Sequence, residues 1–213
     1  MPISHSNQEA IPAVPKVDSL PEIRLRPPGD SAFPQPAFDP PSIQWLAGTW
    51  HVTHSTLPMW KSKRNVRITY TPLPAADAPP AHTGRMDDLV TYQSLSGTSI
   101  KTVHGIDRPS ERAGGGAWKW RGTGLLAIAS SNWEVLGFDT GEHNAPPDPW
   151  VVTYFAKTLF TPAGIDVYSR SSEGLRPEIL DGIKRALSSI GNKELEQLSA
   201  GLFAIQRDKA RDD

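Results

Sequence analysis

The segment Gly48-Thr49-Trp50 constrains the fold more than any other feature of the chain. It opens the first strand-like run and follows a proline-rich leader. A Gly-x-Trp at this place in an antiparallel β protein predicts a small closed barrel, in which a large aromatic side chain fills one end. The interior of such a barrel holds either its own side chains or one ligand.

Strand-like runs and turn signals alternate from Gly48 onward at the spacing of an all-β domain. The predicted strands are Thr49–Pro58, Asn65–Pro72, Asp88–Ser94, Thr98–Gly105, Ala117–Gly122, Asn132–Phe138, Trp150–Phe160 and Ile165–Arg170. Most connections are short, which favours antiparallel neighbours. Eight strands in up-and-down order then close into a barrel, and closure removes the exposed edges of an open sheet.

The chain changes its periodicity after the last predicted strand. Apolar residues recur at helical spacing, namely Ile179, Leu180, Ile183, Ala186, Leu187 and Ile190. Pro177 suits the first turn of a helix and Gly191 suits the position after its end. The pattern predicts an amphipathic helix over residues 177–190, packed on the barrel wall. A second short helix with Leu195 and Leu198 and a strand near 202–206 follow, and residues 208–213 form a charged tail.

Residues 1–41 hold ten of the 21 prolines. Proline interrupts both sheet ladders and helix interiors, so this segment is predicted to be an extended or disordered arm. Ile23, Leu25, Phe33 and Phe38 are apolar enough to dock on the barrel or on a partner. The folded domain is therefore expected over residues 42–207.

The order of these features resembles the lipocalins, within the calycin superfamily, over about residues 45–207. The resemblance implies an eight-stranded antiparallel barrel with Gly48 and Trp50 on the first strand. It also implies that Arg170, near the end of the eighth strand, packs over Trp50 as a structural partner. Lipocalins carry a Thr-Asp-Tyr motif before the seventh strand, where this chain has Val152-Thr153-Tyr154.

Alternation along the strands indicates which side chains face inward. Trp118 and Trp120 share one face of their strand and Lys119 and Arg121 the other, so both tryptophans are expected inside. The predicted ligand-binding residues are Trp118, Trp120, Tyr70, Tyr92, Tyr154, His54 and His104. Mostly apolar walls with a few polar tips are typical of small-molecule pockets, although the same aromatics could simply fill the barrel.

Catalysis remains open at this stage. If the protein is an enzyme, His54 and His104 are the candidate proton carriers of a cofactor-independent isomerase or cyclase. The same two histidines suggest haem ligation as a less favoured alternative, and otherwise no cofactor is expected. No metal site is expected, because His51 and His54 fall on opposite faces of a strand. Carboxylates near turns, such as Asp87, Asp88 and Glu134, are expected to be solvated.

Composition excludes several classes of function. The net charge is −1 and the only basic cluster is Lys61-Ser62-Lys63-Arg64, which is expected to be solvated at a turn, so nucleic acid is not expected as a partner. The absence of cysteine excludes disulfides and thiolate chemistry. No secretory signal or membrane span is apparent, so a cytoplasmic protein is predicted, of unknown oligomeric state. The favoured function is binding of one small hydrophobic molecule, aromatic or polyketide- or terpene-like; an interaction module that uses the proline-rich arm is a further alternative.

Overall fold

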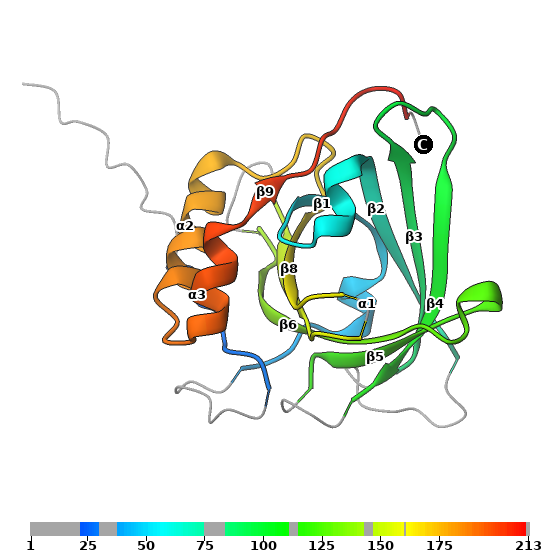
Figure 1. Cartoon of the computed structure of the whole chain (residues 1–213). Coiled ribbons are helices and arrows are strands. Elements are labelled where there is room, and N and C mark those ends of the chain that lie inside the picture. The colour runs from blue at the N-terminus through cyan, green and yellow to red at the C-terminus, as the bar shows by residue number, and fades with distance from the viewer. Residues whose placement is uncertain are drawn as a thin grey trace, which may run out of the picture.

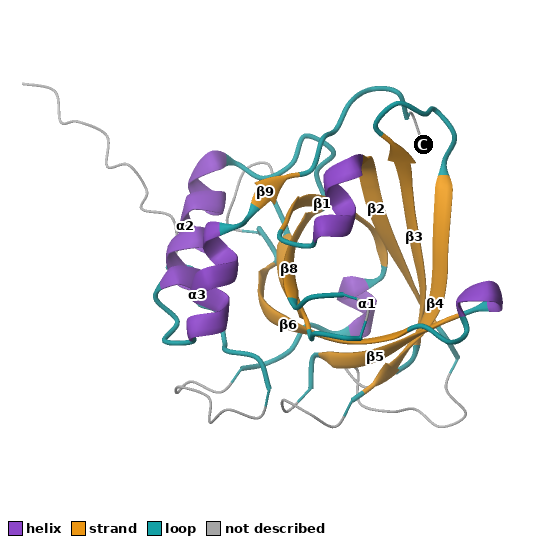
Figure 2. Cartoon of the chain, in the orientation of Figure 1, coloured by secondary structure: helices purple, strands orange, loops and turns teal. Residues whose placement is uncertain are grey.

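Eight antiparallel strands close into a barrel in the computed structural model (Figures 1 and 2), which describes residues 22–29, 38–74, 84–110, 115–142, 147–159 and 161–211. The strands are β1 (Gly48–Ser55), β2 (Lys63–Pro72), β3 (Met86–Ser94), β4 (Lys101–Pro109), β5 (Ala117–Gly122), β6 (Ser130–Asp139), β7 (Trp150–Phe155) and β8 (Gly164–Ser169). Each strand pairs with the next, and β1 pairs with both β2 and β8. The predicted up-and-down barrel is therefore confirmed.

The strand boundaries differ from the prediction where a side chain prevents the backbone from forming the hydrogen bonds of the sheet. β1 ends at Ser55, and Pro58 begins a 3-10 helix, η1 (Pro58–Ser62), because proline fits the first turn and donates no ladder hydrogen bond. β4 begins at Lys101 rather than Thr98. The amide of Gln93 donates to the carbonyl of Thr98 at 2.6 Å, which holds that carbonyl outside the ladder.

One end of the barrel is closed by helix α1 (Ile43–Leu46) and by Trp50. The indole nitrogen of Trp50 donates to the carbonyl of Leu46 at 2.8 Å. The guanidinium of Arg170 lies 3.7 Å from the centroid of the Trp50 ring. Gly48 has φ +91°, and a Cβ there would lie 3.2 Å from Nη1 of Arg170, so glycine leaves room for this stack. The structure thus places Arg170 over Trp50 at a capped end.

Two helices cover the outside of the barrel beside β7 and β8 (Figure 1), α2 (Pro177–Ser188) and α3 (Lys193–Ala200). α2 buries Ile179, Ile183 and Leu187, each of which contributes about 1.5–3 kcal/mol relative to exposure. Asn192 caps α3 by accepting from two backbone amides. The strand β9 (Phe203–Ala204) then pairs with β1. Among the described residues, no helix is long and apolar enough to cross a membrane.

The described part of the proline-rich arm, residues 22–29, lies against β6. The amide of Arg26 donates to the carbonyl of Leu136 at 2.8 Å, and its guanidinium pairs with Glu134 at 2.7 Å. Leu25 occupies the space over Gly137, where a Cβ would lie 2.4 Å from Cδ2 of Leu25. Glu134, expected in solvent, therefore anchors the arm. Residues 1–21 and 30–37 lie outside the described residues.

Candidate functional site

A cavity of about 320 Å³ opens inside the barrel. This volume is at the lower end of the range for small-molecule pockets. Its wall is mainly apolar and comes from η1 and from strands on all sides of the barrel. The apolar lining residues include Leu57, Met59, Trp60, Ile68, Val90, Val103, Trp120, Leu126, Trp133 and Phe155; the polar ones include Tyr70, Asp88, Ser131 and Asp166.

Stacked aromatic rings fill the part of the barrel next to this cavity. Trp133 stacks on Trp118 at 4.6 Å between ring centroids, and on Tyr70 at 5.5 Å. Phe155 lies 6.3 Å from Trp133 on a nearly parallel plane. Trp118 is fully buried in this stack, whereas Trp120 lines the open space. The interior is thus partly filled by its own side chains and partly hollow.

Glycine at position 105 shapes the cavity wall. Gly105 faces inward on β4, and a Cβ there would lie 2.3 Å from Cε2 and Nε1 of Trp120. That distance is far below van der Waals contact, so only glycine lets the indole lie across this strand. The position of Trp120 in the cavity therefore depends on Gly105.

A pair of carboxyl groups lies inside the barrel on adjacent strands. Asp88 lines the cavity from β3 and is 6% exposed, whereas Asp107 on β4 is fully buried. The two carboxyls are close enough to interact electrostatically across the adjacent strands. Trp133 donates its indole N–H to Oδ1 of Asp107 at 2.7 Å. Burial raises the pKa of both groups, and the charge of Asp107 raises the pKa of Asp88 further.

A third buried carboxyl, Asp166 on β8, lines the same cavity. It accepts hydrogen bonds from the hydroxyl of Ser55 and from the indole N–H of Trp60 at 3.3 Å. Burial raises the pKa of Asp166 to about 7, against the opposing effect of these two donors. The hydroxyls of Tyr70 and Tyr168 lie next to one another, near these carboxyls, and burial raises the pKa of both.

The predicted ligand-binding residues separate into two groups. Tyr70 and Trp120 line the cavity, and Trp118 lies in the stack behind them. Tyr92 packs edge-on against Trp60 at 6.0 Å, near the cavity. Tyr154 points outward instead, and its hydroxyl donates to Glu194 of α3 at 3.0 Å.

Both predicted histidines lie on the outer face, which corrects the alternation expected for β1 and β4. The register of β1 shifts between Val52 and His54, so Ser55 rather than His54 faces inward. Burial and the charges of Lys184 and Arg207 lower the pKa of His54 to about 4. On β4, Val103 lines the cavity, and the adjacent His104 bonds Asp87 on the outside at 2.7 Å.

This placement removes the geometric basis for two of the sequence-based hypotheses. Neither His54 nor His104 can transfer a proton to a molecule in the cavity, or hold haem there. The described residues also contain no group of three metal-ligating side chains arranged to hold an ion. The polar groups that do reach the interior are carboxyls and phenols.

Asp107 and Asp166 were missed as site residues, and Asp88 was expected in solvent. Two of the three nevertheless left a signal in the sequence. Asp166 interrupts the apolar run of β8, and Asp88 alternates with Val90 and Tyr92 on the inward face of β3. An acidic residue on the inward face of a barrel strand predicts a buried polar group at the site.

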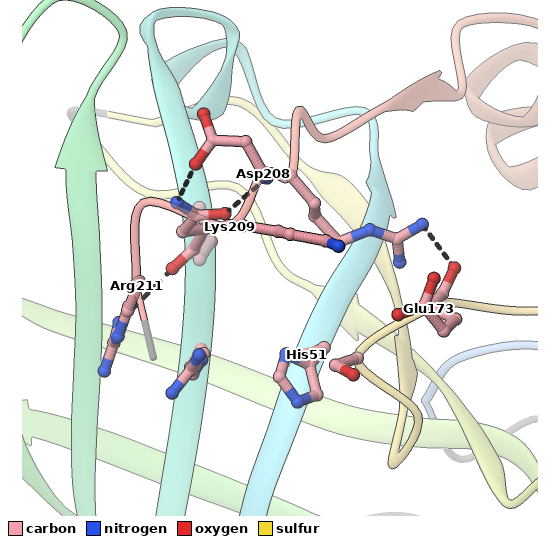
Figure 3. Close-up of a pocket in the computed structure, with 10 residues that line it drawn as sticks. His51, Glu173, Asp208, Lys209 and Arg211 are labelled. Carbon is pink, nitrogen blue, oxygen red and sulfur yellow. Dashed lines mark hydrogen bonds between the residues drawn. The ribbon is translucent and has the colours of Figure 1, made fainter. Parts of the chain in front are cut away.

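A second pocket, of about 470 Å³, lies outside the barrel under the C-terminal segment (Figure 3). His51 forms its floor, with Glu173, Asp208, Lys209 and Arg211 around it (Figure 3). Burial, together with the charges of nearby arginines, lowers the pKa of His51 to about 4. This pocket is polar, and internal contacts such as the Arg64–Asp208 ion pair hold the tail across it.

Comparison with known proteins gives one relative in sequence and several in structure. A curated protein of Botryotinia fuckeliana (strain B05.10), botcinic acid biosynthesis cluster B protein 12, is 30% identical over 189 residues, which cover 85% of this chain and 82% of the relative. No family model matches the chain.

Solved structures of apocrustacyanins share the fold. Apocrustacyanin C2 aligns with a TM-score of 0.53 and 14% identity over 78% of this chain and 79% of its own. Lobster apocrustacyanin A1 aligns with a TM-score of 0.53 and 13% identity over 78% and 80% of the two chains. Together with the closed barrel, these likenesses confirm the lipocalin-like fold predicted from the sequence.

Proposed function

The chain belongs to the family of botcinic acid biosynthesis cluster B protein 12, and from that premise we propose that it binds a small, largely apolar molecule inside its barrel. The name of that relative places it in a cluster for the biosynthesis of botcinic acid. A biosynthetic role of the same kind for this chain would supply organic molecules as guests for the cavity.

One observation supports the proposal above the others: the hollow half of the barrel is walled by indole and aliphatic groups, with polar groups at only a few points. Apolar walls favour burial of a hydrophobic guest at about 25 cal/mol per Å². The face of Trp120 favours a guest with a flat ring or conjugated segment. Asp88 and Tyr70 offer hydrogen bonds to an oxygen on such a guest.

The proposal is tested by calorimetric titration with 2-tetralone, 2-naphthol and farnesol. At roughly 0.5 kcal/mol per heavy atom, a guest of about eleven heavy atoms should bind with a Kd on the order of 0.1 mM. Val103→Phe fills the cavity and should abolish binding. Thr102→Phe places the same ring on the exposed outer face of β4 and should leave the affinity unchanged.

A wild-type protein that binds none of the three probes contradicts the proposal. Equal affinities of the Val103→Phe and Thr102→Phe variants contradict it as well, because they would place the bound molecule outside the barrel. Circular dichroism checks that both variants fold.

A further inference from the structure

Three carboxyl groups lie inside an apolar barrel, and packing alone does not account for them. Asp88, Asp107 and Asp166 are each at most 6% exposed. Within the described part of the chain, no lysine or arginine forms an ion pair with any of the three. Burial of carboxyls without cations costs stability, and apolar side chains of similar volume would fill the space better.

Two of these carboxyls face the same cavity from different strands. Asp88 comes from β3 and Asp166 from β8, and β1 and β2 separate these strands in the ring. Oδ1 of Asp88 is fully buried and accepts no hydrogen bond from a described donor. A guest in the cavity can therefore meet the remaining part of the Asp88 carboxyl and, from another strand, the Asp166 carboxyl, whose oxygens accept from two donors.

The surroundings raise the pKa of both groups, but that of Asp88 further than that of Asp166. Asp107, Tyr70 and Tyr168 lie around Asp88, and Asp87 precedes it on the outer face of β3. None of these groups carries a positive charge, so Asp88 keeps its proton. The groups around Asp166 on β1, η1 and β8 are Ser55, Trp60 and Tyr168, and the first two donate to its oxygens. These two bonds stabilise the ionised form of Asp166 near neutral pH.

We propose that the cavity is an active site in which Asp88 is the general acid and Asp166 the general base of a cofactor-independent isomerisation by proton transfer. The substrate class is a small apolar molecule with a carbonyl group, an acidic C–H bond beside it and a carbon–carbon double bond next to that carbon. The inference rests on the proposed function, because the molecule must first enter the barrel. Asp107 is a positioning residue that keeps Asp88 protonated.

The proton transfers balance without any co-reactant. The Asp166 carboxylate takes the proton from the carbon next to the carbonyl, and the electron pair of that C–H bond forms the enol double bond. The Asp88 carboxyl gives its proton to the carbonyl oxygen, so the bound molecule becomes a neutral enol. Return of the Asp166 proton to the far end of the resulting dienol, with return of the oxygen proton to Asp88, forms the conjugated carbonyl isomer and restores both residues. Pairs of groups with separated pKa values commonly divide acid and base roles in this way.

The test measures exchange of the α-hydrogens of 2-tetralone with deuterium from D2O, by mass spectrometry, at saturating probe. Positioned acid–base groups contribute about 10²–10⁴-fold to such a rate. Asp166→Asn and Asp88→Asn should each lower the exchange rate by about 10²-fold or more, while calorimetry still detects bound 2-tetralone. Asp181→Asn, an exposed charge change on α2, should leave the rate unchanged.

The pH profile of the wild-type protein gives a measurement that needs no variant. The rate should rise with pH through about 7 as Asp166 ionises, and fall at higher pH as Asp88 loses its proton. Asp107→Asn removes a negative neighbour, so it should move the alkaline limb to lower pH without moving the acid limb. If Asp107 had a purely structural role, Asp107→Asn would change the stability of the protein but would shift neither limb of the pH–rate profile.

Two results overturn the inference. The first is that the wild-type protein binds 2-tetralone but exchanges its hydrogens no faster than Asp166→Asn does, or at a rate that stays constant between about pH 5 and 9. In that case the binding proposal stands and the catalytic one fails. The second is that the wild-type protein does not bind 2-tetralone. The proposed function then fails for guests of this kind, and the catalytic inference fails with it.

Discussion

Removal of the Arg170 guanidinium should weaken the whole barrel. Its N–H groups donate to the carbonyls of Thr49 at 2.9 Å, Trp45 at 2.7 Å and Ala47 at 2.7 Å. Hydrogen bonds from a charged donor contribute about 1.5–3 kcal/mol each, and the contact with the Trp50 ring contributes about 0.5–2 kcal/mol. Because the site is only half-buried, water replaces part of the loss. Arg170→Met should therefore lower the free energy of unfolding by about 3–5 kcal/mol.

Chemical denaturation and thermal melting measure this loss. A decrease of that size corresponds to a fall in Tm of about 6–20 °C for a domain of this length. Arg170→Lys keeps the charge but lacks the planar fork, so it should recover only part of the loss. Arg121→Met removes an exposed arginine of β5 and should change the stability by less than about 0.5 kcal/mol. A loss below about 1 kcal/mol for Arg170→Met would refute the role given to this residue.

Three further outcomes follow from the described contacts. Gly105→Ala should displace Trp120 and weaken 2-tetralone binding by about 10-fold; calorimetry that finds the wild-type Kd would show that the indole does not set the pocket. Gly137→Ala should push Leu25 off β6, so limited proteolysis should cleave the arm faster, and unchanged cleavage would argue against docking. The pKa of His51 is lowered to about 4, so its contribution to stability is complete above pH 6.5 and is lost as pH falls through about 4; an NMR titration of His51 with a midpoint near 6.5 would contradict this.

The sequence determined the barrel because turn signals and strand-like runs recur along most of the chain. The helical period near 177–190 likewise predicted α2, which ends two residues earlier, at Ser188. Face assignments succeeded where one side of a strand meets water: on β5, Lys119 and Arg121 are exposed and Trp118 is buried.

The prediction of which side chains face inward failed where both sides of a strand are buried or where the register shifts. The outer face of β7 lies under α2 and α3, so five of its six residues are buried and no alternation marks the inward side. Tyr154 was therefore placed inside, although its hydroxyl reaches Glu194 of α3. On β1, the register shift after Val52 moves His54 to the outer face. A single sequence carries no signal for that shift, because it arises from pairing with β8.

Under the proposed mechanism, burial of the interior carboxyls accounts both for their cost in stability and for their role in proton transfer. The aromatic stack of Trp118, Trp133 and Tyr70 already fills part of the barrel, so carboxyls are not needed there to complete a core. The low dielectric that penalises Asp88 and Asp166 also strengthens their interaction with a bound carbonyl, and it keeps one of them protonated near neutral pH. Positions that violate the apolar pattern of a core are expected at functional sites, where stability is lost in exchange for chemistry. The barrel meets the structural condition for such a site, because its capped end and closed hydrogen-bond ring hold these groups in place without help from a ligand.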